Sequence, residues 1–170
     1  MLMKARADPA PQSPPQPSGR EQLKCQWELL TVISREVMVL ARRQQQEIGD
    51  SEQPLDPDWD RLFMEERERR FAVWTARNAK GTLVGYAFVF LTTSLWSRGI
   101  VLAMIKLFYL APEWRTGWLG LKFMRSLFAA IDKLNPQATI QVETNDWAMP
   151  RVAILLERCN FRRVHTTYQR

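Results

Sequence analysis

Arg115, Gly117 and Gly120 lie within six residues of one another, at the joint between an apolar run and a helical pattern. Residues 102–110 are apolar at nearly every position, which predicts a strand buried on both faces. Four apolar residues after the joint recur at helical spacing and predict a helix with one buried stripe: Met124, Leu127, Ile131 and Leu134. Because the first N–H groups of a helix lack intrahelical partners and point outward, the joint predicts an anion site, for which phosphate is the usual occupant.

This joint resembles the acyl-CoA diphosphate loop of the GNAT acetyltransferase superfamily, in which Arg or Gln is followed by two residues, Gly, one residue, and Gly or Ala. Arg115 and Gly120 match the two ends of that pattern. Trp118 stands where the middle glycine is usual, and Gly117 comes one place early. The resulting spacing, Arg115-x-Gly117-x-x-Gly120, resembles a diverged branch of the superfamily that is common in bacteriophage and prophage genomes. The resemblance covers residues 27–170.

A second segment resembles the last helix of the same superfamily, which usually ends in Leu-Tyr-Glu-Lys-x-Gly-Phe. Asn160 replaces the glycine, a change that still permits a left-handed helix cap. The tyrosine, which serves as general acid in the family, would fall at Leu156, and a leucine cannot donate a proton. Four residues fit the motif: Leu155, Glu157, Arg158 and Phe161.

The resemblance implies that acetyl-CoA is the co-substrate and that an amine accepts the acetyl group. Backbone N–H groups of the central strand would hold the thioester carbonyl, and the loop would hold the diphosphate at the positive end of the helix. No metal is expected, since the single histidine, His165, cannot assemble an ordinary zinc site. The expected cofactor-binding residues are Phe108, Tyr109, Leu110, Arg115, Thr116, Gly117, Trp118, Leu119 and Gly120.

Transfer to an amine also needs a group that takes the amine proton. Glu143, at the end of a predicted strand over residues 139–143, is the candidate general base, acting directly or through a water; the alternative is a solvent-facing glutamate. Lys106 is the only polar side chain of the central run, and it either faces a substrate anion or reaches solvent along its own stem. A general acid is not essential, because a thiol has a pKa of only about 8.5 and its thiolate is a tolerable leaving group.

Composition predicts one globular domain. We expect residues 1–21, rich in proline, to form a disordered tail, and residues 22–170 to form the acyltransferase domain. The net charge of +6 favours anionic partners. Lys106 interrupts the longest apolar stretch, so no transmembrane helix is expected. Cys25 and Cys159 are far apart and form no CxxC pair, which indicates reduced thiols and a cytoplasmic protein.

Periodicity predicts helices over residues 22–48 and 59–70, the second capped by Asp58, and then strands over 71–77, 82–92 and 102–110. The central helix follows, then the strand 139–143, a helix that begins at Pro150, and a last strand over 161–168. A short strand within 27–33 is an alternative to the start of the first helix. The predicted fold class is α/β (α+β), GNAT-like, with a central mostly antiparallel mixed sheet flanked by helices.

Three functions stay open at this point. The first is an acyl-CoA-dependent N-acyltransferase acting on an unidentified amine, carried by a small molecule or a protein. The second is a catalytically degenerate relative that binds CoA or serves as an interaction module, which Leu156 and the altered loop favour. The third, a nucleic-acid-binding domain, has only the net charge and exposed aromatic residues in its favour, because the basic residues are scattered. A homodimer is compatible with all three.

Overall fold

The computed structural model describes residues 22–48, 55–95, 97–143 and 149–162. Within these ranges it has five strands, four α-helices and one 3-10 turn. In chain order they are β1 (Lys24–Glu28), α1 (Leu30–Ile48), α2 (Trp59–Arg67), β2 (Phe71–Arg77), β3 (Leu83–Thr93), β4 (Val101–Leu110), η1 (Pro112–Trp114), α3 (Leu119–Leu134), β5 (Thr139–Val142) and α4 (Met149–Glu157).

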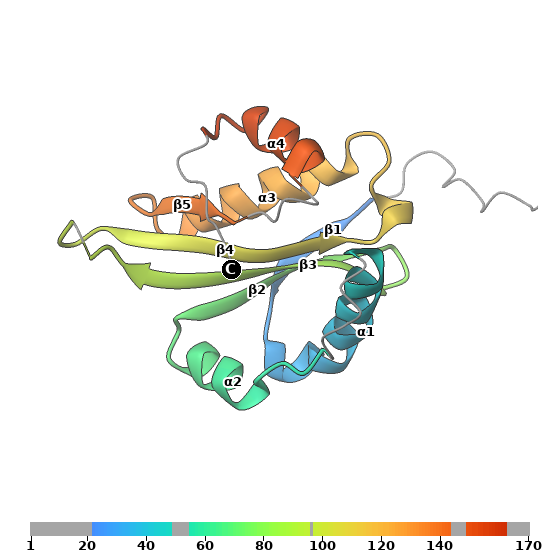
Figure 1. Cartoon of the computed structure of the whole chain (residues 1–170), viewed down its shortest axis with the longest axis horizontal. Coiled ribbons are helices and arrows are strands. Elements are labelled where there is room, and N and C mark those ends of the chain that lie inside the picture. Colours follow the sequence, from blue (N-terminus) through green and yellow to red (C-terminus); the bar gives the residue numbers. More distant parts are fainter. Residues whose placement is uncertain (1–21, 49–54, 96, 144–148, 163–170) are drawn as a thin grey trace, which may run out of the picture.

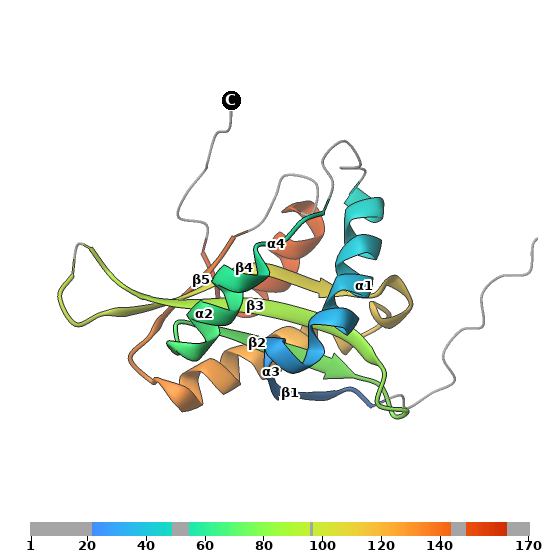
Figure 2. The same ribbon diagram turned by 90° about the horizontal axis from the view of Figure 1, so that it is seen from below.

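The strands form one sheet in the order β1-β2-β3-β4-β5. The first three pairings are antiparallel, and the last, between β4 and β5, is parallel. Helices α3 and α4 lie on one side of the sheet, and α1 and α2 lie on the other (Figure 1). On the second side α1 contacts β3 and β4, while α2 contacts β2 (Figure 2). The mixed, mostly antiparallel sheet flanked by helices confirms the predicted fold class.

The predicted helix over residues 22–48 is wrong in its first part, because Lys24–Glu28 form the edge strand β1. Trp27 lies three residues before Leu30 and therefore matched the helical stripe. In the structure Trp27 instead pairs with Trp74 across the strands, with ring centroids 4.8 Å apart. The rest of the prediction holds, since α1 buries the expected stripe of Leu30, Ile33, Val37 and Leu40.

Smaller corrections concern element ends. The cap at Asp58 is confirmed, since its Oδ1 accepts the Arg61 N–H at 3.0 Å, but α2 ends at Arg67 rather than at residue 70. Within α2, Met64 is 46% exposed. Leu134, expected in the buried stripe of α3, is 68% exposed because it lies in the last turn of the helix. Phe161 and Arg162 lie outside any strand, and the remainder of the expected last strand falls outside the described residues.

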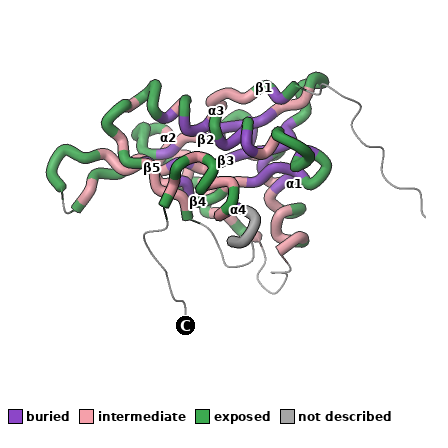
Figure 3. Tube along the Cα trace, turned by 90° about the horizontal axis from the view of Figure 1, so that it is seen from above, coloured by how far each residue is buried: buried purple, intermediate pink, exposed green. Residues whose placement is uncertain are grey.

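The buried residues run along the middle of the sheet and the facing sides of α1 and α3 (Figure 3). Small side chains on the sheet, at Ala76, Ala87 and Ala103, are fully buried. On α3 the stripe includes Phe123 and Leu127, both at most 1% exposed. The core therefore fixes α3 and, with it, the position of the loop that precedes this helix.

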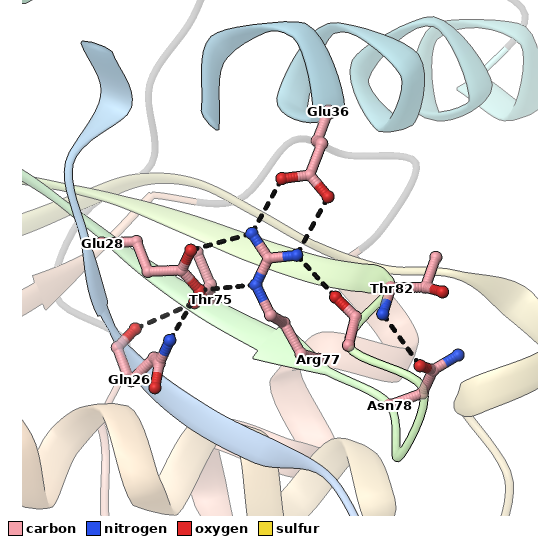
Figure 4. A network of polar contacts seen from close by, with 8 residues as sticks. Gln26, Glu28, Glu36, Thr75, Arg77, Asn78 and Thr82 are labelled. Atoms are coloured by element: carbon pink, nitrogen blue, oxygen red, sulfur yellow. Dashed lines mark hydrogen bonds and ion pairs between the residues drawn. The ribbon is translucent and has the colours of Figure 1, made fainter. Parts of the chain in front are cut away.

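Arg77 joins β1, β2 and α1 through one polar network (Figure 4). Its guanidinium donates to Glu28 through Nε and Nη2, both at 2.8 Å, and to Glu36 of α1 at 2.8 and 2.9 Å. Thr75, which is fully buried, donates to Glu28 Oε1 at 2.6 Å. These hydrogen bonds, with that of Arg77 first, lower the pKa of Glu28 to about 2 despite its partial burial.

Stability should depend on acid through Glu28. Because the pKa of this carboxyl lies near 2 in the folded protein and at its ordinary value of 4.5 in the unfolded chain, its stabilisation is complete above pH 4.5 and is lost as pH falls toward 2. The difference corresponds to roughly 3 kcal/mol in the limit. Glu28→Gln should therefore lower the unfolding free energy at pH 7, measured by denaturant titration, and should flatten its fall between pH 5 and 3.

The matched control is Glu36→Gln, which removes the more exposed of the two carboxylates on Arg77. Solvent screens an exposed pair, so this variant should lose less stability and keep the acid dependence of the native chain. Equal acid dependence in native protein and Glu28→Gln would contradict the assignment.

Candidate active site

Strand β4 has a strand neighbour on both sides for only part of its length. On one side β3 pairs with it from Val101 to Leu110. On the other side β5 pairs with Leu102–Ile105 alone. Among the described residues, Lys106–Leu110 therefore have no strand on the β5 side, and we call this stretch the open edge.

A β-bulge marks the start of the open edge. Phe88 pairs with Leu107 and Val89 pairs with Ile105, so Lys106 is the extra residue. A bulge bends the strand and redirects the side chains on either side of it. The prediction that β4 is buried on both faces is wrong here, since Lys106 and Leu107 are exposed. The bulge and the end of β5 together leave them uncovered.

The hydrogen-bond pattern shows which backbone groups face outward on the open edge. The Ala111 N–H donates to Val84 O at 2.9 Å, so this pair exchanges hydrogen bonds with β3. Because such pairs alternate along an antiparallel ladder, Tyr109 and Leu107 also direct their backbone groups toward β3. Phe108 and Leu110 therefore point theirs away from β3, toward the open side. These are two of the three strand residues expected to hold the thioester.

Gly85 keeps the end of β4 in this position. It lies opposite Leu110, and a Cβ built on it would come within 2.8 Å of Leu110 Cδ1 and 2.9 Å of the Tyr109 carbonyl oxygen. A backbone atom cannot move aside without shifting the strand. No sequence motif marks this glycine, since it lies in an ordinary strand pattern.

The β4–α3 loop presents backbone N–H groups at the start of a helix. Among the N–H groups of residues 116–121, that of Leu119 alone has a backbone acceptor within the described chain, Thr116 O at 3.3 Å. Gly117 has φ +57, and Trp118 follows in the αR region. Alternation of these two conformations turns successive N–H groups toward one point and forms an anion-binding nest. Thr116, Gly117 and Trp118 are exposed, while Leu119 and Gly120 are half-buried.

Arg115, expected to bind phosphate, is already engaged by the protein. Its Nη1 and Nη2 donate to the two carboxylate oxygens of Glu47 on α1, the second at 2.9 Å. Its Nε donates to Leu110 O at 2.5 Å, and its Cζ lies 5.1 Å from the ring centroid of Tyr109. Burial, followed by the Glu47 charge, raises the pKa of Tyr109. Sequence reasoning missed Glu47, because it is 68 residues away and lies on the polar side of a predicted helix.

Trp118, the residue that departs from the family pattern, has a side chain 72% exposed. It borders a shallow hollow along α3, together with Lys122 and Arg125. Its bulk therefore projects into solvent and does not fill the space above the loop. A Cβ added at Gly120 would also meet no atom within 4 Å. The loop thus leaves room for a ligand at its backbone.

Glu143 and Lys106 come together at the other end of the open edge. The Glu143 N–H donates to Ile105 O at 2.9 Å, which extends the β4–β5 ladder by one residue. Its carboxylate forms an ion pair with Lys106, and both side chains are partly exposed, at 53% and 38%. Lys106 thus contacts a protein carboxylate, an arrangement that neither sequence alternative specified.

The remaining expectations concern α4, the thiols and metals. Leu156 is half-buried and packs against the core, and Asn160 has the left-handed φ of +63 that was predicted. Cys25 and Cys159 are free. In the described part of the chain, no cluster of three or more His, Cys, Asp or Glu could hold a metal ion. None of the described helices has the length and apolar character needed to cross a membrane.

Comparison with solved structures identifies the fold. An aminoglycoside acetyltransferase from an uncultured soil metagenomic sample, in complex with sisomicin, aligns with a TM-score of 0.63 over 86% of this chain and 95% of that one, at 16% identity. Glucosamine-6-phosphate N-acetyltransferase from Arabidopsis thaliana aligns with a TM-score of 0.63 over 88% and 98%, at 12% identity. A Trypanosoma brucei acetyltransferase gives 0.62 over 87% and 98%, at 14% identity.

The chain therefore has the fold of the GNAT acetyltransferases. No family model matches its sequence, and no curated protein matches it. The structural likeness spans nearly the whole of each of these neighbours.

Gly85→Ala should destabilise the protein. The added methyl would overlap the Tyr109 carbonyl and Leu110, and overpacking of this kind costs typically 1–3 kcal/mol. The unfolding free energy from urea titration should fall by about that amount. Gly120→Ala is the matched control: its Cβ meets no atom within 4 Å and it lies in a helix, where Ala is favoured over Gly. Equal stability of Gly85→Ala and native protein would contradict the close approach.

Proposed function

We propose that the chain is an acyl-CoA-dependent N-acyltransferase that transfers the acetyl group of acetyl-CoA to an amine. One observation carries the proposal: the open edge of β4 is followed, after the turn η1, by a loop at the start of α3 in which the N–H groups of residues 116–118 have no backbone acceptor within the described chain. An extended ligand with amide groups along its length and a diphosphate at one end matches this arrangement. The acetyltransferase fold supports the same conclusion at a coarser level.

The residues present fit acetyl-CoA. The backbone groups of Phe108 and the N–H of Leu110 are available to the amides of an extended chain, in the manner of an added strand, while the Leu110 carbonyl accepts from Arg115. The N–H groups from Thr116 to Gly120 are available to the diphosphate, at the positive end of α3. Acetyl-CoA would supply an activated thioester, whose carbonyl carbon is open to attack.

The reaction would proceed by direct attack of the amine. Glu143 takes a proton from the ammonium, directly or through a water, and the free amine nitrogen then bonds to the thioester carbon. A backbone N–H of the open edge stabilises the charge that develops on the carbonyl oxygen. The C–S bond breaks and the thiolate leaves, taking a proton from solvent because Leu156 provides none, and the nitrogen gives its remaining extra proton to solvent as the amide forms.

The ion pair at Glu143 has a consequence for acceptor binding. An ammonium group that approaches the carboxylate must compete with the Lys106 side chain. Since both side chains are partly exposed, this ion pair contributes little free energy, and an acceptor ammonium can replace Lys106 at little cost. Glu143 is therefore accessible to an acceptor amine in the structure as it stands.

The branch of the superfamily and the cellular location are proposed from the sequence. The spacing Arg115-x-Gly117-x-x-Gly120 supports a place in the diverged phage and prophage branch. Two free cysteines are in keeping with a cytoplasmic protein. The second candidate function is CoA binding without catalysis, favoured by the half-buried Leu156 in place of the usual tyrosine.

Native protein should bind CoA, and Arg115→Ala should bind it about tenfold to a hundredfold more weakly, because hydrogen bonds of a charged group contribute roughly 1.5–3 kcal/mol. Isothermal titration calorimetry at low salt measures both values. Asp132→Asn, on the exposed face of α3, serves as the control and should bind like native protein. Absence of binding heat with native protein would overturn the proposed function.

Glu143→Gln separates an enzyme from a binder. The variant should keep the fold and the CoA affinity but lower acetyl transfer by roughly a hundredfold or more, the usual contribution of a positioned general base. Transfer is measured as release of CoA thiol in a colorimetric assay with a panel of primary amines. A full rate for the variant on a confirmed acceptor would remove Glu143 from the mechanism, whereas CoA binding without thiol release across the panel would favour the second candidate.

A further inference from the structure

Two ion pairs of opposite orientation join α1 to the β4–α3 loop. Helix α1 provides Arg43 and Glu47, which lie four residues apart and so project from the same face. The loop provides Glu113 and Arg115 in return. Arg43 reaches both carboxylate oxygens of Glu113, at 3.0 and 3.2 Å, and Arg115 reaches both oxygens of Glu47. The charges of Glu113 and Arg115 in the loop are therefore each matched by an opposite charge on α1.

The pair between Arg115 and Glu47 is the more protected of the two. Its side chains are 35% and 25% exposed, against 44% and 52% for Arg43 and Glu113. Solvent screening leaves an exposed pair with little energy, so the link through Arg115 dominates. The contact between Nε and the Leu110 carbonyl adds a third point of attachment, at the end of the open edge.

These contacts occupy most of the N–H groups of the Arg115 guanidinium. Of the five N–H groups of an arginine, one donates to Leu110 and two donate to Glu47, while the ring of Tyr109 lies near Cζ. The two N–H groups that remain, one on each terminal nitrogen, face opposite sides of the guanidinium. To hold a phosphate through two N–H groups at once, Arg115 would therefore have to leave Glu47 as a partly buried carboxylate without its cation. Removing one partner of such a pair is unfavourable.

The neighbouring N–H groups of the loop carry no such penalty. Within the described chain, the backbone hydrogen bonds nearby leave the N–H groups of Thr116, Gly117 and Trp118 without a backbone acceptor. An anion placed there gains hydrogen bonds and breaks none. The loop N–H groups can therefore bind a phosphate without losing a contact, whereas the Arg115 guanidinium would have to give up Glu47.

We propose that Arg115 is a positioning residue: paired with Glu47, it holds the β4–α3 loop against α1, and the loop backbone rather than the guanidinium contacts the diphosphate. The inference rests on the proposed function, since it concerns the same CoA site. It changes what Arg115→Ala means, because the loss of affinity then comes from a displaced loop. It also adds Glu47, an acidic residue, to the groups on which binding of an anionic ligand depends.

The decisive variant is Glu47→Ala, with CoA as the probe in calorimetry. A guanidinium that contacts phosphate would be released by this change, and CoA would bind as tightly as before or more tightly. A positioning role predicts the opposite: Glu47→Ala should weaken CoA binding about as much as Arg115→Ala, tenfold or more. The double variant should be no weaker than Arg115→Ala alone, because both changes break one link.

Three further measurements exclude a general loss of structure. Pantetheine lacks the diphosphate, so its affinity should be the same in native protein and in both single variants. The charge-exchanged pair, Glu47→Arg with Arg115→Glu, should recover at least tenfold in CoA affinity over Glu47→Arg alone. Glu65→Ala breaks an exposed ion pair with Arg70, away from the loop, and should leave CoA affinity unchanged. Unchanged or tighter CoA binding by Glu47→Ala would overturn the proposal.

Hydrogen exchange without ligand separates this proposal from the proposed function. If Glu47 and Arg115 hold the loop, the amides of residues 116–121 should exchange faster in Glu47→Ala and Arg115→Ala, and equally so in the two. That result together with no CoA binding by native protein would retain the loop contact and reject the function. CoA binding by native protein with unaltered exchange in both variants would retain the function and reject the positioning role.

Discussion

The partial pairing of β4 is the constraint on which the rest of the site depends. Where β5 stops, the outward backbone groups of β4 lose their strand partner, and at the same point the bulge at Lys106 turns the strand. An unpaired strand edge is normally a hazard, because it recruits other chains. Here it is short, it begins beside an ion pair, and it ends at a helix N-terminus. Those three features favour a ligand of defined length over a second strand.

Helix α1 is held at two points by an arginine, one in strand β2 and one in the β4–α3 loop. Near its beginning, Glu36 accepts from Arg77, and near its end Glu47 accepts from Arg115. Between them the apolar stripe of α1 packs on β3 and β4, while Gln44 accepts from the hydroxyl of Tyr86 at 2.7 Å. Apolar burial supplies the attraction, and the polar contacts at the two ends set the position along the sheet. The loop before α3 is thereby supported by a helix that lies about 70 residues earlier in the chain.

Sequence periodicity predicted most of the elements, since a strand or helix with one buried face shows that face directly. It failed at β1, where Trp27 fits both a strand and the start of a helix, and the choice depends on a partner strand that is distant in the chain. The apolar run predicted neither the open edge nor the bulge. The open edge depends on where the pairing with β5 ends, and an extra residue within a continuous apolar run leaves no gap in the pattern. The role of Gly85 depends on a contact across strands, and that of Glu47 depends on an arginine far along the chain. Neither type of contact has a local signature.

The bulge at Lys106 has a further consequence for how this site can persist through sequence change. A bulge depends on how many residues lie between two fixed pairings, here Phe88 with Leu107 and Val89 with Ile105, and hardly at all on which residues they are. Substitution alone does not remove it, and an insertion or deletion is required. A site formed by the backbone in this way depends on the number of residues between the two pairings, so nearly every side chain around it can be replaced without removing it. That property accords with a fold shared with other acetyltransferases at only 12–16% identity.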